Sequence, residues 1–284
     1  MVSVLVTGGS GFIGTHLCSY LHQNGYDVIS LDNNHTGAKP WECVLADIRD
    51  QLQFDGIDVI IHLAAQISVA ASVEDPDHTL SVNIDGTKSV ISAAELSGVK
   101  RILFASSAAI YGDSEEIPIK ESNPLIPQSP YAVSKIVGEE LCLQSNLQSC
   151  SMRFFNVYGP GQSAEGGYAA VIPAFKKAID EKVAPRVFGD GTQIRDFVHV
   201  LDLVKIIEQL VRIEDLPECV NVASGEATSL LDLLEGLSHL NPKMETPLFE
   251  GERSGDIHTS IADITMLKKY IPQFVPIPIQ EGLK

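Results

Sequence analysis

Short apolar runs alternate with helix-like stretches along the first 160 residues of the chain. Residues 2–6, 27–31, 44–46, 59–63, 101–105 and 151–155 have the apolar composition of buried strands. Helical spacing of apolar positions separates these runs, most clearly at 13–23, 79–96 and 131–144. Because strands that alternate with helices usually pair in parallel and are buried on both faces, the pattern predicts an α/β fold with a doubly wound parallel sheet.

The composition of the sequence changes after Gly159, Pro160 and Gly161, where proline and glycine become more frequent and the segments with a regular apolar period become shorter. A length of 284 residues suits one large or two modest domains. We therefore expect two domains with a main boundary near residue 160. Residues 281–284 resemble the start of a helix, and the sequence leaves open whether the natural chain ends there or a helix is missing.

The composition favours a soluble enzyme over several other classes of protein. Lys and Arg number 20 against 37 Asp and Glu, and the net charge of −17 would repel nucleic acids and anionic membranes, although it is also compatible with a saline habitat. The five cysteines are scattered without a C-x-x-C pair, so neither a disulfide framework nor a metal site is expected. Residues 2–6 lead directly into glycines rather than into a signal peptide, and no apolar stretch is long enough to span a membrane. We expect a cytoplasmic protein.

A glycine-rich loop with Gly8, Gly11 and Gly14 follows the first predicted strand and opens the first predicted helix. In this context glycines let the backbone approach the pyrophosphate of a dinucleotide at the helix N-terminus. Asp32 ends the second predicted strand at a spacing suited to the adenosine ribose, and a carboxylate there would repel the 2′-phosphate of NADP. The loop therefore predicts NAD as the cofactor, and the alternative is a glycine turn that only lets helix and strand pack closely.

Tyr131 and Lys135 lie four residues apart in a predicted helix and therefore on one helical face. A phenol titrates at about pH 10 and abstracts protons poorly at neutral pH unless nearby positive charge favours the phenolate. Lys135 and an oxidised nicotinamide ring would supply such charge. The pair therefore indicates redox chemistry at a carbon that bears a hydroxyl group, although a tyrosine beside a surface lysine is the structural alternative.

Other short motifs occur in a fixed order along the chain, at Asp47-Ile48, 62–66, Asn83 with Gly86-Thr87, 106–112, 153–156, 195–199 and Arg253 with Asp256. Together with the glycine loop and the Tyr/Lys pair, they resemble the extended short-chain dehydrogenases/reductases. Within that superfamily the chain resembles the NAD-dependent epimerase/dehydratase family, most closely its UDP-glucose (UDP-galactose) 4-epimerases. The resemblance runs from Val2 to about Asp263.

The resemblance implies a Rossmann-type NAD-binding domain at 1–160 and a smaller C-terminal α/β domain at 161–284 that binds the nucleotide sugar, with some segments returning to the first domain. It also implies a homodimer formed through the helices at 79–96 and 131–144. The positions that match cofactor-binding residues of the family are Gly8, Gly11, Phe12, Ile13, Gly14, Asp32, Asn33, Thr36, Gly37, Asp47, Ile48, Leu63, Ala64, Ala65, Gln66, Asn83, Ser106, Tyr131, Lys135 and Phe154.

The resemblance also assigns catalytic roles. Ser107 matches the residue that hydrogen-bonds the reacting sugar hydroxyl, Tyr131 matches the base, and Lys135 matches the residue that binds the nicotinamide ribose and lowers the pKa of the tyrosine. Tyr131 would take the proton of the sugar 4-hydroxyl while the C4 hydride passes to NAD⁺, which gives a bound 4-keto sugar. Return of the hydride to the opposite face would invert C4.

Positions that match substrate-binding residues include three that would hold the diphosphate, where guanidinium groups suit phosphate oxygens. The alternative for one of them, Arg195, is a structural ion pair with the adjacent Asp196. Ser260 matches a position at which a bulky tyrosine is associated with rejection of N-acetylated sugars, so both acetylated and plain UDP-hexoses are candidates. The full set is Val69, Ser107, Ala108, Tyr131, Asn156, Arg195, Arg253, Asp256 and Ser260.

Ala108 and Ala109 argue against other reactions of the family. Dehydratases of this group carry an Asp-Glu pair after the catalytic serine or threonine, and UDP-glucuronate decarboxylases carry a Glu at the second position, whereas alanine has no proton to transfer. The segment 66–72 contains no arginine to pair with a sugar carboxylate, which favours a neutral hexose. A UDP-glucuronate epimerase, an atypical dehydratase and a non-catalytic NAD-sensing protein remain the alternatives.

Overall fold

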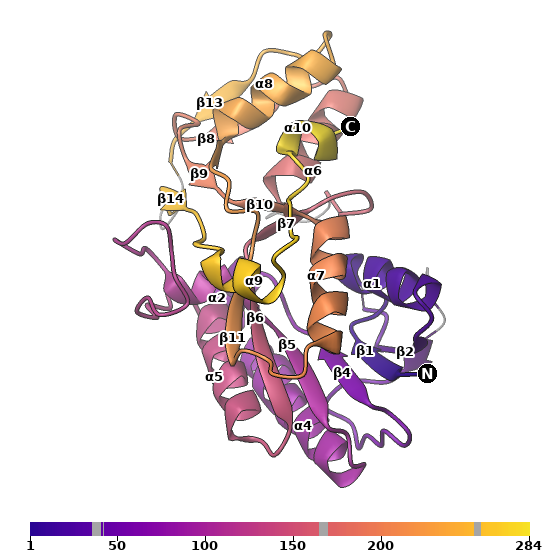
Figure 1. Cartoon of the computed structure of the whole chain (residues 1–284). Coiled ribbons are helices and arrows are strands. Elements are labelled where there is room, and N and C mark those ends of the chain that lie inside the picture. The colour runs from indigo at the N-terminus through magenta and orange to yellow at the C-terminus, as the bar shows by residue number, and fades with distance from the viewer. Residues whose placement is uncertain (36–40, 42, 165–169, 253–256) are drawn as a thin grey trace.

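The computed structural model describes residues 1–35, 41, 43–164, 170–252 and 257–284. A seven-stranded parallel sheet, hydrogen-bonded in the order β11-β6-β5-β4-β1-β2-β3, forms its larger part (Figure 1). The strand order reverses between β1 and β4, which is the arrangement of a Rossmann-type sheet and confirms the predicted fold class. The strands are β1 Ser3–Thr7, β2 Asp27–Asp32, β3 Cys43–Leu45, β4 Val59–His62, β5 Arg101–Ser107, β6 Gln148–Phe154 and β11 Cys219–Val222.

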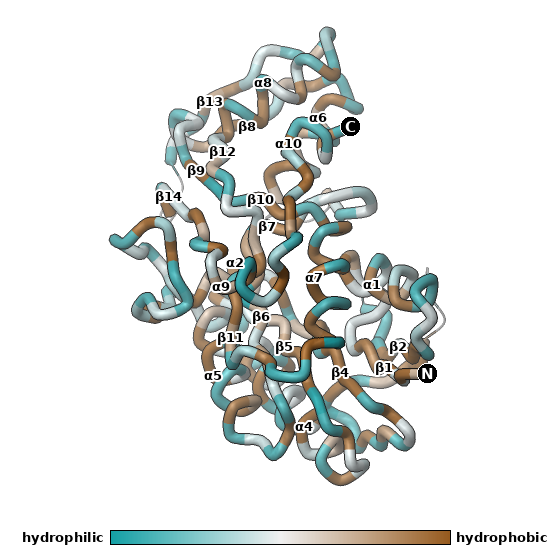
Figure 2. The backbone as a smooth tube through the Cα atoms, viewed as in Figure 1, coloured by the Kyte–Doolittle hydropathy of each residue, from teal (hydrophilic) through white to brown (hydrophobic). Residues whose placement is uncertain are grey.

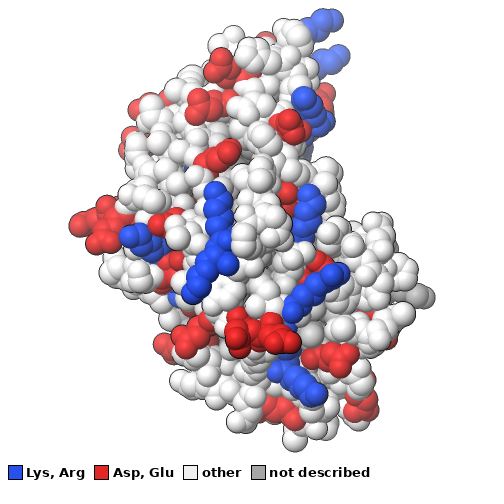
Figure 3. All heavy atoms as spheres, viewed as in Figure 1, with Lys and Arg blue, Asp and Glu red and all other residues white. Residues whose placement is uncertain are grey.

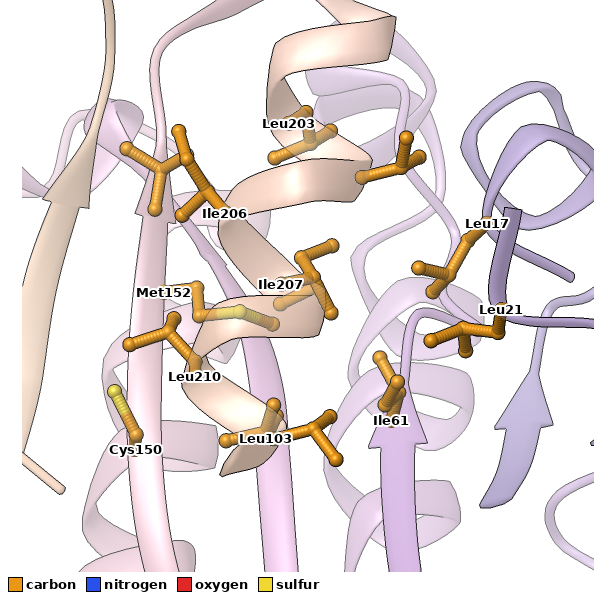
Figure 4. Close-up of a cluster of buried hydrophobic side chains, with 14 of the residues drawn as sticks. Leu17, Leu21, Ile61, Leu103, Cys150, Met152, Leu203, Ile206, Ile207 and Leu210 are labelled. Carbon is orange, nitrogen blue, oxygen red and sulfur yellow. The ribbon is translucent and has the colours of Figure 1, made fainter. Parts of the chain in front are cut away.

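Helices cover both faces of this sheet. Because successive side chains of each strand point to opposite faces, one strand contributes to an apolar cluster on each face. Val4 and Val6 of β1 belong to one apolar cluster and Leu5 belongs to another. The first cluster lies beneath α1 (Phe12–Gln23) and α7 (Val200–Arg212), and Figure 4 shows leucines and isoleucines of α7 packed between α1 and the strands. The second cluster lies beneath α4 (Gly86–Leu96) and α5 (Pro130–Gln144).

The helix predicted at 79–96 consists of three consecutive segments, α3 (Pro76–Leu80), the π-helical turn η1 (Ser81–Asp85) and α4. π-helical turns often mark functional positions, and this one contains Asn83. Two further helical segments lie close to the carboxyl ends of the strands. They are α2 (Val69–Glu74) and the 3₁₀ turn η2 (Ala108–Tyr111).

A smaller α/β unit lies beyond the carboxyl ends of the strands (Figures 1 and 2). Its core joins Phe175, Val187, Leu233, Leu237 and Leu283. Three segments that follow residue 160 lie with the large sheet instead, because β11 pairs with β6, α7 packs against α1, and α9 packs against β11. The remaining elements are β7 Asn156–Tyr158, α6 Val171–Asp180, β8 Arg186–Phe188, β9 Ile194–Arg195, β10 Phe197–His199, β12 Thr228–Ser229, α8 Leu230–Leu240, β13 Leu248–Glu250, β14 Thr259–Ser260, α9 Thr265–Tyr270 and α10 Ile279–Gly282.

Acidic side chains outnumber basic ones, and Figure 3 shows both kinds distributed over the two parts of the molecule. Within the described ranges, no helix has both the length and the apolar composition that a bilayer span requires. The same part of the chain contains no cluster of three or more His, Cys, Asp or Glu side chains that could hold a metal ion.

Candidate active site

The glycine-rich loop joins β1 to α1. Gly8 has a φ of +74°, and a Cβ at this position would lie 2.7 Å from the backbone nitrogen of Ala64. A Cβ on Gly14 would collide with the carbonyl oxygen of Gly8. Gly11 is the N-cap of α1, and no described side chain caps this helix end. The loop is therefore tightly packed while the N–H groups that open α1 stay accessible to an anion.

Asp32 ends β2 beside this loop. Its Oδ2 accepts a hydrogen bond from the backbone N–H of Ser10 at 3.0 Å, and its Oδ1 accepts one from the N–H of Asn34 at 2.7 Å. The two bonds hold the carboxylate next to the glycine loop, where it could accept hydrogen bonds from ribose hydroxyls. The predicted cofactor residues Thr36 and Gly37 lie outside the described residues.

Asp47 and Ile48 follow β3. Arg49 donates to both carboxylate oxygens of Asp47, at 2.9 and 2.8 Å, and these bonds lower the pKa of the Asp47 carboxyl to about 2, with a further contribution from Asn33. Ile48 is buried against Gly86. Arg49 was not singled out from the sequence, although its position two residues after Asp47 is a local signal for such a pair.

A buried chain of polar side chains holds the turn after β4. His62 lies 2.6 Å from Thr7 through Nδ1 and 3.0 Å from Thr87 through Nε2, measured to the hydroxyl oxygens. Thr87 donates to the carbonyl oxygen of Asn83 at 2.6 Å. The Asn83 side chain then accepts from the N–H of Gln66 at 2.7 Å and donates to its carbonyl at 3.0 Å. Asn83, a predicted cofactor residue, thus uses its amide to hold the backbone of Gln66.

Ser107, Tyr131 and Lys135 meet at the carboxyl end of β5. Ser107 is the last residue of that strand, whereas Tyr131 and Lys135 lie on the first turns of α5. The Ser107 side chain is close enough to the Tyr131 phenol to influence its pKa. The Nζ of Lys135 lies 5.7 Å from the centroid of the Tyr131 ring and donates to the carbonyl oxygen of Ala105 at 2.8 Å.

Burial controls the protonation of these groups. It raises the pKa of the Tyr131 phenol, and the polar Ser107 side chain acts in the opposite direction. It also lowers the pKa of Lys135 to about 8. Lys135 is therefore still largely protonated at neutral pH, and a cation at this distance favours the phenolate form of Tyr131.

The other predicted cofactor residues lie near the same edge of the sheet. Within the described part of the chain, the buried Ser106 Oγ and Gln66 Oε1 have no hydrogen-bond partner, so each can bind a ligand. Together with the glycine loop and Asp32, these atoms fit a dinucleotide that lies across the carboxyl ends of the strands. The remaining positions are Phe12 and Ile13 in α1, Leu63, Ala64 and Ala65 after β4, and Phe154 at the end of β6.

A cavity of about 410 Å³ lies among β7, α6, β8, β9 and β10 of the smaller α/β unit and is lined by Asn156 and Arg195, two predicted substrate residues. Its walls also include Phe175, Arg186 and Phe188, which the sequence did not single out. An aromatic and aliphatic wall next to guanidinium groups can hold a nucleobase and a diphosphate. The volume is within the range of small-molecule sites.

Ser260 lies directly opposite Arg195, because β14 pairs with β9 in a register that joins these two residues. Position 260 is therefore beside a residue that lines the cavity. Arg253 and Asp256, the other two positions predicted to bind the nucleotide, lie outside the described residues.

Asp196 has a structural role that the sequence did not indicate. Its buried carboxylate accepts hydrogen bonds from the N–H and the hydroxyl of Ser224 at 2.8 and 2.7 Å, from Gly225 N at 2.9 Å and from Ala262 N at 3.3 Å. Burial raises the pKa of this carboxyl, and the hydrogen bonds oppose the shift. The arrangement ties the junction between β9 and β10 to the segments that follow β11 and β14.

The two remaining predicted substrate residues are apolar. Ala108 directly follows Ser107 and opens η2, and Val69 opens α2, which packs against α5. The side chains at 108 and 109 are both methyl groups. This turn therefore places no acid or base beside Ser107.

Comparisons with known proteins show the family of this chain. Residues 4–223 match the family described as the NAD dependent epimerase/dehydratase family. The UDP-glucose 4-epimerase of Mycolicibacterium smegmatis is 33% identical, with 98% of this chain and 95% of that protein covered. Among solved structures, the UDP-N-acetylglucosamine 4-epimerase of Methanobrevibacter ruminantium is 32% identical with a TM-score of 0.91, over 99% of this chain and 96% of that one. An NAD-dependent NDP-hexosamine 5,6-dehydratase is 29% identical with a TM-score of 0.91, over 99% and 95%.

Proposed function

Because the chain belongs to the NAD-dependent epimerase/dehydratase family, we propose that it interconverts the C4 epimers of a UDP-hexose. The observation that carries the proposal is the convergence of Ser107, Tyr131 and Lys135 at the end of β5. The set combines a proton acceptor, a hydroxyl group that orients the substrate, and a cation.

NAD, when bound, supplies a site that accepts the C4 hydride of the sugar and gives it back. The glycines of the 8–14 loop would hold its pyrophosphate and Asp32 its adenosine ribose, because the loop leaves the N–H groups of α1 accessible and fixes the carboxylate beside them. Lys135 and Ser106 would hold the nicotinamide side, since Ser106 Oγ is buried without a partner among the described residues.

Tyr131 moves the proton in this proposal. Its phenolate accepts the proton of the sugar 4-hydroxyl as the hydride leaves C4, and the phenol returns the proton when the hydride comes back. Burial opposes the phenolate, and the charge of Lys135 favours it. Ser107 orients the same sugar hydroxyl, because its own hydroxyl lies beside the phenol oxygen.

Inversion requires the 4-keto sugar to expose its opposite face while the rest of the molecule stays bound. The cavity lined by Asn156, Arg195 and Phe188 suits this task, because it can hold UDP while the sugar turns. The diphosphate would contact Arg195, and by resemblance Arg253 as well. Binding energy from the nucleotide would thereby keep the intermediate in the site.

The proposed substrates are UDP-glucose and UDP-galactose, together with their N-acetylated counterparts. Ser260 beside Arg195 is small enough to leave room for an acetamido group, and one similar structure is named as a UDP-N-acetylglucosamine epimerase. Although another neighbour is named as a dehydratase, Ala108 and Ala109 provide no acid or base for elimination.

Two further proposals concern the division into domains and the oligomeric state. We propose that residues 1–160 and the segments that return to the large sheet bind NAD, and that the rest of 161–284 binds the nucleotide sugar. We also propose a homodimer formed through the helices within 76–96 and α5. Light scattering of the purified protein tests the dimer, and a monomeric mass at micromolar concentration would contradict it.

Product analysis tests the function. Purified protein is incubated with NAD and each of the four UDP-sugars, and products are separated by chromatography and weighed by mass spectrometry. We expect a stereoisomer of unchanged mass. Loss of water would instead indicate a dehydratase, and binding of NAD without turnover of any sugar would indicate a non-catalytic protein.

A single substitution tests the role of the tyrosine. Tyr131→Phe should lower kcat by roughly 10²–10⁴, the usual contribution of a general base, while UDP binding is retained. Tyr270→Phe in α9, away from the site, is the matched control and should keep the parent rate. Equal turnover by Tyr131→Phe and the control would remove the tyrosine from the mechanism.

A further inference from the structure

A buried polar network joins α5, the helix that carries Tyr131, to η2, the turn that directly follows Ser107. Arg153 of β6 donates to both carboxylate oxygens of Glu139 on α5, at 3.0 and 2.8 Å. Its remaining nitrogen donates to the hydroxyl oxygen of Tyr111 at 2.8 Å and to the carbonyl oxygen of Glu121 at 2.8 Å. The Tyr111 hydroxyl in turn donates to Asn221 Oδ1 at 2.6 Å.

The positions of these residues along their elements are informative. Glu139 follows Tyr131 and Lys135 at intervals of four on α5, so the three residues follow one side of the helix. Tyr111 ends η2. Ser107 is the N-cap of this turn, and its hydroxyl oxygen accepts a hydrogen bond from the N–H of Ala109 at 3.2 Å. Arg153 thus contacts both the helix that carries the base and the turn that follows the serine.

A contribution to the free energy of unfolding does not by itself explain why this network is buried here. The side chains of Arg153 and Glu139 are only 6% and 12% exposed, and a buried ion pair often contributes no more than apolar residues of similar size because both charges lose their hydration. A planar guanidinium group does, however, impose fixed directions on its partners. This property is useful where two elements must keep a precise relative position.

We propose that Arg153, Glu139 and Tyr111 are positioning residues that set the approach of the Ser107 hydroxyl to the Tyr131 phenol. The inference rests on the proposed function, because it concerns the proton transfer at that pair. The three residues act through the two elements that they join rather than by contact with the sugar.

The chain offers a closely matched control. Tyr26 is also buried, donates to Glu208 at 2.9 Å, and accepts from Arg212 at 3.0 Å. The guanidinium carbons of Arg153 and Arg212 lie 5.2 and 5.8 Å from the ring centroids of Tyr111 and Tyr26. The Tyr26 network joins the residue directly before β2 to α7, and its residues Tyr26, Glu208 and Arg212 lie outside α5 and η2.

The experiment compares Tyr111→Phe with Tyr26→Phe under saturating NAD and UDP-sugar. Each rate is normalised to the folded, NAD-loaded protein, so that partial unfolding does not count as lost catalysis. We expect Tyr111→Phe to lower kcat roughly tenfold or more, as misplacement of reacting groups does, with KM and NAD content near parent values. The control should keep the parent kcat.

Arg153→Lys is the second variant, because it retains a charge for Glu139 but not the planar donors. We expect the same selective loss of kcat, together with slower reduction of bound NAD in a single turnover. Normalised kcat values equal to those of Tyr26→Phe, or losses confined to KM or to the folded fraction, would overturn the inference. Absence of turnover by the parent protein on all four sugars would contradict the proposed function itself and is therefore a distinguishable failure.

Discussion

His62 makes the stability of the fold depend on pH in a way that can be calculated. Its ring is fully buried between Thr7 and Thr87, and burial, with a smaller effect of the Lys135 charge, lowers its pKa from 6.5 to about 3. Above pH 6.5 the ring is neutral in both the folded and the unfolded chain. Below that pH only the unfolded chain takes up the proton, so acid favours unfolding until the folded pKa is reached.

The size of the effect follows from this difference in proton binding. Between pH 6.5 and pH 3 the unfolded state binds up to one more proton than the folded state, which lowers the free energy of unfolding by about 1.4 kcal/mol per pH unit. At pH 5 the His62 contribution is therefore about 2 kcal/mol. This is a substantial fraction of the stability of a typical domain.

Urea unfolding at pH 7 and pH 5, followed by circular dichroism, measures this contribution. His62→Gln keeps a polar side chain near the two threonines but removes the titration, and His239→Gln at the exposed end of α8 is the control. All samples contain the same saturating NAD concentration, because bound ligand also stabilises the fold. We expect the parent and the control to lose about 2 kcal/mol more than His62→Gln between the two pH values. Equal losses in all three proteins would refute the reasoning.

Two further predictions concern the cofactor loop and the substrate. Gly8→Ala should abolish NAD binding and destabilise the fold by more than Gly25→Ala, because both positions have a positive φ but only the Cβ at position 8 would meet backbone atoms. Gly25→Ala should lower the free energy of unfolding by about 1 kcal/mol from its φ alone. Isothermal calorimetry with NAD and urea unfolding measure the two effects, and equal effects of the two variants would contradict the predicted collision. Ser260→Tyr should selectively lower kcat/KM for the N-acetylated UDP-hexoses, as measured by chromatography of the products. Comparable turnover of both sugar classes by the variant and the parent would count against a role of position 260 in substrate choice.

Local features of the sequence were sufficient for the fold class and for part of the candidate site. The periods of apolar residues identified the first six strands of the large sheet, and they place Tyr131 and Lys135 one turn apart without reference to any other segment. The glycine loop was recognisable because its requirement for residues without a side chain is also local. Resemblance to a family added the candidate roles of Ser107 and of the nucleotide-binding residues.

Only the tertiary structure shows which residues that are distant in the sequence lie close together. The return of β11 and α7 to the large sheet, the cavity wall that contains Phe188, and the four donors that surround Asp196 all join segments separated by tens of residues. The protonation of His62 and Lys135 likewise depends on burial, which arises only when the helices cover the sheet. Periodicity along a chain specifies which face of an element is apolar, whereas packing of distant elements decides what that face meets and how much water is removed from it.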